Sequence, residues 1–157
     1  MTPFNLKPED VVNEIHEFNS KLAQGYKTLA ELGEIEVGVS DKEAVYQEDN
    51  LILYHFKSRT KKQNSVPLLI VYALVNRPYM ADLQDGRSMV QGLLDEGVDV
   101  YLIDWGYPVS ADKYLTLDDY INGYIARCVD VICEKHNRKN INLLGICQGG
   151  AFSLCFT

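Results

Sequence analysis

Apolar residues in the first part of the chain recur at the spacing of an amphipathic helix. Between positions 8 and 32 they are separated by steps of four, three, four, four and three residues, at Val11, Ile15, Phe18, Leu22, Tyr26 and Leu29. This spacing places them on one face of a helix, and Pro8 followed by the acidic pair Glu9-Asp10 favours a helix start there. We expect this face either to pack on its own domain or to contact a partner subunit.

The pattern changes to strands after position 41. Two apolar segments, 44–47 and 51–56, flank the polar residues 48–50, which predicts a β-hairpin. The next apolar run, residues 67–74, shows no alternation with polar residues. Such a run is typical of a strand that is buried on both faces of a parallel sheet.

Helix and strand patterns alternate along the rest of the chain. The predicted elements are a helix at 85–96, a strand at 98–103, a helix at 116–137, a strand at 140–144 and a short helix from 151. Thr116 and Asp119 resemble a capping box at the start of the long helix. The residues expected on its inner face are Leu117, Tyr120, Tyr124, Cys128 and Val131. This order predicts an α/β fold whose sheet becomes parallel, and the last helix is so short that the fold looks incomplete.

Composition limits the kinds of molecule that the chain is expected to bind. The chain has 157 residues with 15 Lys and Arg against 22 Asp and Glu, a net charge of −7, which argues against binding to nucleic acid or an anionic membrane. The longest apolar run, residues 68–75, is far shorter than the roughly 20 residues of a membrane-spanning helix. The first ten residues lack the basic and apolar regions of a signal peptide. These features predict a cytoplasmic protein without a membrane span.

The four cysteines, at positions 128, 133, 147 and 155, show neither zinc-site spacing nor a suitable histidine partner. We expect no metal, and no disulfide framework in a protein without a signal peptide. Cys147 differs from the others because it lies in a Gly145-x-Cys147-x-Gly149 pattern between a predicted strand and a predicted helix. We interpret Cys128, Cys133 and Cys155 as core residues.

The pattern around Cys147 is typical of a nucleophile elbow, or lipase-like box, in which small neighbours permit a strained turn. The N-terminus of the following helix favours negative charge on the sulfur. The backbone N–H of Gln148 is then the first expected oxyanion donor. The second is expected from the loop after residues 67–74, where Val75 is our candidate. A glycine-rich turn with an inert cysteine, and a plain loop at Val75, are the alternatives.

The sequence does not supply an obvious general base. In this architecture the acid and the histidine follow the nucleophile, but the ten residues after Cys147 contain no His, Asp or Glu. His136 is expected at the opposite edge of the sheet, and His16 and His55 on the surface of a helix and a strand. Asp104 is expected to cap the loop that follows it.

The whole chain resembles the N-terminal part of the catalytic subunit of class III polyhydroxyalkanoate synthases. The resemblance rests on four blocks in the same order, at residues 67–79, 99–108, 115–124 and 142–151. It implies an α/β-hydrolase-type fold and an acyltransferase that polymerises (R)-3-hydroxyacyl-CoA, chiefly 3-hydroxybutyryl-CoA, into polyhydroxyalkanoate with release of CoA. It further implies Cys147 as the nucleophile that forms a covalent thioester, with CoA thioester as substrate and no cofactor.

The same resemblance implies a second, non-catalytic synthase subunit and the surface of cytoplasmic polyester granules as partners. The family's aspartate and histidine lie in a C-terminal portion that these residues do not contain. We therefore expect an N-terminal helical segment at 1–40 and an incomplete catalytic domain at 41–157, inactive and poorly stable alone. The alternatives are a cysteine-nucleophile hydrolase of esters or lactones with the same fold, and a non-catalytic remnant that binds a partner.

Overall fold

The computed structural model describes residues 8–31 and 37–157. The described residues belong to two compact units that divide after residue 35, and each is described by itself. The first contains the 24-residue helix α1 (Pro8–Glu31), which confirms the predicted helix; its expected last residue, Leu32, lies outside the described residues. The role of its apolar face stays a prediction. Within the described ranges no helix has the length and apolar character needed to cross a membrane.

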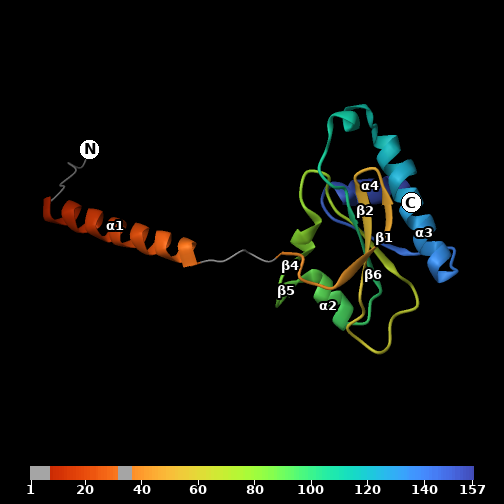
Figure 1. Cartoon of the computed structure of the whole chain (residues 1–157), viewed down its shortest axis with the longest axis horizontal. Coiled ribbons are helices and arrows are strands. Elements are labelled where there is room, and N and C mark those ends of the chain that lie inside the picture. Colours follow the sequence, from red (N-terminus) through yellow and green to blue (C-terminus); the bar gives the residue numbers. More distant parts are fainter. Residues whose placement is uncertain (1–7, 32–36) are drawn as a thin grey trace, which may run out of the picture. The chain divides into compact units, whose positions relative to one another are not determined.

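The second unit is built around a five-stranded sheet with the order β1-β2-β6-β3-β7. Figure 1 labels β1, β2 and β6 of this sheet. Its strands are β1 (Lys42–Glu48), β2 (Leu51–Phe56), β3 (Leu68–Val71), β6 (Val100–Asp104) and β7 (Asn142–Gly145). The predicted hairpin is confirmed because β1 and β2 pair antiparallel. β2 also pairs antiparallel with β6, whereas β3 is parallel to both β6 and β7. The carboxyl ends of these three parallel strands therefore meet at one edge.

Helices cover both faces of this sheet, as the unalternating run at 67–74 predicts. On β3, Leu69 and Val71 join a core with α3 (Ala126–His136) and α4 (Gln148–Phe156). Ile70, between them, points to the other face and joins a core with α2 (Met89–Asp95). The side chains of a strand alternate between the two faces, so a strand enclosed by helices on both sides is apolar at every position.

The helix predicted at 85–96 begins later than expected, at Met89. Residues before it form a small hairpin of β4 (Asp82–Gln84) and β5 (Arg87–Ser88). Gly86 adopts a positive φ of 71° in the connecting turn, a conformation that interrupts a helix. The Ser88 hydroxyl then accepts the N–H of Gln91 at 2.9 Å, which caps α2.

The long helix predicted at 116–137 is present, but its first part is a π-helical segment (Asp119–Ile125) that continues into α3. The capping pair is confirmed, since Thr116 donates both its N–H and its hydroxyl to Asp119 at 2.7 Å. The wider π turn changes which residues face inward. Leu117, expected inside, is 64% exposed, and Ile121 and Ile125 are buried.

Two short 3₁₀ helices, Pro78–Ala81 and Ser110–Tyr114, were not expected from the pattern.

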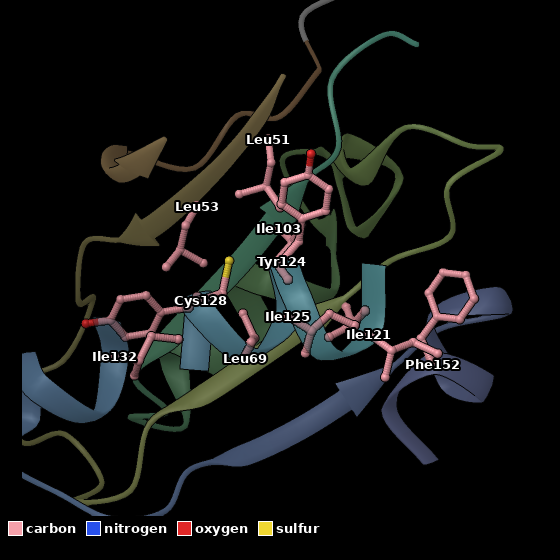
Figure 2. Close-up of a cluster of buried hydrophobic side chains, with 12 residues drawn as sticks. Leu51, Leu53, Leu69, Ile103, Ile121, Tyr124, Ile125, Cys128, Ile132 and Phe152 are labelled. Carbon is pink, nitrogen blue, oxygen red and sulfur yellow. The ribbon is translucent and has the colours of Figure 1, made fainter. Parts of the chain in front are cut away.

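The cysteines outside the elbow differ from one another in burial. Cys128 is buried among aliphatic side chains, as predicted (Figure 2), and this burial raises the pKa of its thiol to about 12. Cys133 is half-buried, whereas Cys155 is exposed near the end of α4. The interpretation of Cys155 as a core residue was wrong because α4 begins at Gln148, which turns position 155 outward.

Candidate active site

Cys147 lies in a sharp turn between β7 and α4, the predicted strand and helix on either side of it. Its backbone has φ 57° and ψ −122°, which is rare for a residue with a Cβ atom. Holding such a conformation costs on the order of 1–3 kcal/mol and is found mostly at functional sites. The side chain is exposed, so the turn presents the sulfur at the carboxyl edge of the parallel strands.

Two glycines make this turn possible through close approach of the backbone. A Cβ atom on Gly149 would collide with the carbonyl oxygen of Val71, and one on Gly145 would collide with the backbone of Gly150. The spacing Gly-x-Cys-x-Gly is therefore a packing requirement of the elbow. It brings the start of α4 directly against the end of β3.

Backbone hydrogen bonds fix the elbow in place. Ile146 donates its N–H to Val71 O at 2.9 Å, and Gly149 and Gly150 donate to Ile146 O and Cys147 O at 3.0 Å. Gln148 is the first residue of α4, where an N–H has no partner inside the helix. Among the hydrogen bonds of residues 37–157 none takes the N–H of Gln148, so it can donate to a negatively charged oxygen beside Cys147.

Val75 lies in the loop that follows β3, residues 72–77, which we call the β3 loop. Val71 pairs with Gly145 across β3 and β7, so the β3 loop and the elbow leave adjacent strands at the same edge. The Val75 side chain is 82% exposed. No hydrogen bond within the second unit's described residues uses its backbone N–H, which leaves that group available as well.

A cavity of about 500 Å³ opens between the β3 loop and the β6 loop, residues 105–108. Its walls include Val75, Trp105, Tyr107 and Tyr120. Trp105 packs edge-on against Tyr120 with ring centroids 5.5 Å apart, and Tyr120 stacks on Phe152 of α4 at 6.4 Å. One row of aromatic rings thus runs from the cavity wall to the helix that begins at the elbow.

The two imidazoles of the described second unit lie away from Cys147. His55 Nε2 is 2.7 Å from Asp99 Oδ1, and His136 Nε2 is 3.2 Å from Asp99 Oδ2. Asp99 precedes β6, whereas the elbow lies at the carboxyl edge. The predicted position of His136 is confirmed. His55 is not the surface residue that we expected: its side chain is only 20% exposed and stacks on Tyr101 at 4.2 Å.

The histidines of this cluster change the pKa of Asp99. Burial raises the pKa of Asp99, but the hydrogen bond and charge of His55 and the charge of His136 outweigh that effect, so the pKa lies below its usual value.

The other carboxylate predicted from the sequence, Asp104, accepts the N–H of Gly106 at 2.9 Å and so caps the β6 loop as expected. Within residues 8–31 and 37–157, no three His, Cys, Asp or Glu side chains are grouped as metal ligands.

Comparisons with known proteins agree with this arrangement. A family model described as "Poly-beta-hydroxybutyrate polymerase (PhaC) N-terminus" matches residues 8–93, and one for the alpha/beta hydrolase fold matches residues 66–157. A putative lipase from Sulfolobus solfataricus has a similar structure, with a TM-score of 0.53 and 19% identity over 74% of this chain and 45% of its own. That likeness shows the fold.

Among curated relatives, the poly(3-hydroxyalkanoate) polymerase subunits PhaC of Thiocystis violacea and Allochromatium vinosum are each 55% identical to this chain. The matches cover 99% and 100% of the chain but 44% and 45% of the relatives, so the chain spans less than half of their length. The polymerase subunit of Cupriavidus necator is 32% identical over 83% of the chain and 22% of its own length. With its α/β-hydrolase fold, the chain thus belongs to the poly-beta-hydroxybutyrate polymerase (PhaC) family.

Proposed function

We propose that this protein is a polyhydroxyalkanoate synthase in which Cys147 is the covalent nucleophile. The observation that carries the proposal is the elbow, which holds an exposed cysteine at φ 57° at the carboxyl edge of the sheet. The names of the relatives support a polymerase of 3-hydroxyalkanoates. The proposed substrates are (R)-3-hydroxyacyl-CoA thioesters, chiefly 3-hydroxybutyryl-CoA, with no further cofactor.

The proposed reaction has two acyl transfers. The Cys147 sulfur, having given its proton to a base, attacks the thioester carbonyl carbon, the bond to the CoA sulfur breaks, and CoA leaves with a proton. The hydroxyl group at the end of a polyester chain then attacks the acyl-cysteine, gives up its proton, and releases Cys147. The first step exchanges one thioester for another and is nearly balanced in free energy.

The backbone N–H groups of Gln148 and Val75 are the proposed donors to the oxyanion formed in each step. Both groups are unused by the described residues around them, and register places their segments side by side. The cavity lined by Trp105 and Tyr107 opens on the same edge. We propose that it receives the apolar acyl part of the substrate, since such cavities bind apolar groups.

The proposed general base lies outside the described residues of the second unit, because His55 and His136 are both engaged by Asp99 at the other edge. Residues 1–157 alone are therefore proposed not to polymerise. The word "subunit" in the names of the relatives supports assembly with a second polypeptide. A non-catalytic synthase subunit and the surface of a cytoplasmic polyester granule are the proposed partners.

The test uses the full gene product with 3-hydroxybutyryl-CoA. We expect CoA release, polymer, and an acyl mass on the peptide that contains Cys147, all of which Cys147→Ala should abolish. Cys155→Ala, at another exposed cysteine on α4, is the matched control and should retain activity. Free 3-hydroxybutyrate in place of polymer would support the hydrolase alternative, and full activity of Cys147→Ala would refute the proposal.

A further inference from the structure

Arg77, the last residue of the β3 loop, connects that loop to the β6 loop. Its Nη1 donates to the carbonyl oxygen of Gly106 at 2.7 Å, and its Nη2 lies 3.4 Å from Asp104 Oδ1. The guanidinium also stacks on the Tyr107 ring, 4.1 Å from its centroid. One side chain therefore makes three kinds of contact to the residues that end and follow β6.

A second connection holds the other end of the β3 loop. Trp105 Nε1 donates to the carbonyl oxygen of Tyr72 at 2.9 Å. The β3 loop is therefore fixed to the β6 loop at its first residue by Trp105 and at its last by Arg77. Within it, Asn76 Oδ1 accepts the N–H of Arg77 at 2.8 Å, so the backbone on both sides of Val75 is restrained.

Both terminal nitrogens of Arg77 make contacts inside the protein. Nη1 is taken by Gly106, Nη2 faces Asp104, and Nε is buried without an acceptor among the residues that the structure describes. The nearby carboxylate already balances its positive charge. These contacts favour a structural task for the guanidinium over binding of the phosphates of a CoA substrate.

We propose that Arg77 is a positioning residue for acyl transfer at Cys147, acting through the backbone N–H of Val75. By holding the β3 loop against the β6 loop, it keeps that N–H aimed at the carbonyl oxygen of the group attached to the sulfur. The inference rests on the proposed function, because it assigns the reason why one oxyanion donor is in place. A preorganised donor needs no rearrangement when charge develops.

The expected effect is on the rate of the chemical step. Removing an oxyanion donor lowers kcat by about 10²–10³-fold. Displacing the donor without removing it should lower kcat by a smaller factor. We expect Arg77→Ala to lower kcat by about 10- to 100-fold while KM changes less than about threefold, because the interaction is made in the transition state. Arg77→Lys should retain only part of the kcat that Arg77→Ala loses, since an ammonium cannot make the same forked contacts.

The experiment measures kcat and KM of the full gene product with two thioesters of 3-hydroxybutyrate, one on CoA and one on N-acetylcysteamine, which lacks phosphates. Positioning predicts the same loss of kcat with both. Arg59→Ala is the matched control, since Arg59 forms an exposed ion pair with Asp95 at 2.7 Å, and it should behave as the parent protein. If Arg77→Ala does not fold, Arg77→Lys, which keeps a positive charge beside Asp104, should show the same pattern more weakly.

The outcomes separate the inference from the proposed function. A rise in KM confined to the CoA thioester would identify Arg77 as a phosphate-binding residue and overturn positioning. Unchanged kcat in a folded Arg77→Ala, or in Arg77→Lys if Arg77→Ala does not fold, would overturn it as well. If Cys147→Ala keeps its activity in the same assays, the proposed function itself fails, whatever the arginine variants do.

Discussion

His55 Nε2 and Asp99 Oδ1 lie 2.7 Å apart at the edge of the sheet opposite to Cys147. His136 of α3 also contacts Asp99, while Lys135 of α3, Glu43 of β1 and Tyr101 of β6 contact the two histidines. Four elements separated in sequence therefore meet in one cluster around a buried carboxylate. The cluster serves the stability of the fold, away from the proposed chemistry.

The low pKa of Asp99 gives the cluster a defined pH dependence. Because the folded pKa lies below the unfolded value of about 3.9, the ionised carboxylate stabilises the fold above that pH, and this contribution is lost as pH falls through the folded pKa. We expect Asp99→Asn to lower the free energy of unfolding by about 1.5–3 kcal/mol at pH 7. Urea unfolding at pH 7 and at lower pH should show the difference shrinking below pH 4; a constant difference would contradict the assignment.

A second prediction concerns the glycine that packs against Val71. Gly149→Ala should lower polymerase activity of the full gene product by at least about 100-fold, or prevent folding, because the added carbon has no room beside β3. Gly92→Ala is the matched control. Gly92 lies inside α2 with open space around it, so the change should leave activity intact and stabilise the protein by up to about 1 kcal/mol. Thermal melting and CoA release measure both, and an active, folded Gly149→Ala would count against the elbow.

The cysteines should differ in their reaction with iodoacetamide in the native protein. Cys147 and Cys155 are exposed and should be alkylated, whereas Cys128 should remain unmodified at pH 8 because burial excludes the reagent and raises the pKa of the thiol to about 12. Peptide mass spectrometry after short exposure measures this. Alkylation of Cys128 at the rate of Cys155 would show that the core between the sheet and α3 is open.

The hydroxyl of Tyr124 donates to Asp49 at 2.6 Å, and this bond raises the pKa of the tyrosine above its usual value. It joins the π-helical segment to the turn of the β1–β2 hairpin. Tyr124→Phe should cost about 1.5–3 kcal/mol of unfolding free energy, as for other bonds to a charged group. Tyr114→Phe, at an exposed ring, should cost close to nothing; equal costs in urea unfolding would contradict the role of the bond.

Local patterns predicted most of the sheet and the elbow. The run at 67–74 indicated burial on both faces, and the glycine spacing around Cys147 indicated a strained turn between a strand and a helix. Both inferences depend only on neighbouring residues. The candidate Val75 followed in addition from the fold expected around the elbow, in which the loop after the buried strand supplies the second oxyanion donor.

Other features were missed because they depend on long-range contacts or on an unusual helical turn. Leu117 was placed inside because a regular helical period was assumed, and the π-helical segment breaks that period. His55 was expected on the surface because its partner Asp99 is 44 positions away. Arg77 was not predicted as a functional residue because the acceptor on Gly106 and the Tyr107 ring become its neighbours only through the pairing of β3 with β6.

The bond from Ile146 N–H to Val71 O has a consequence for how the site tolerates thermal motion. Val71 ends β3, so the same strand end supports the elbow on one side and continues into the loop of Val75 on the other. A shift of β3 therefore moves the Cys147 sulfur and the Val75 amide together, because both segments are attached to the end of that strand. The distance between the Cys147 sulfur and the Val75 N–H therefore changes little when the sheet fluctuates.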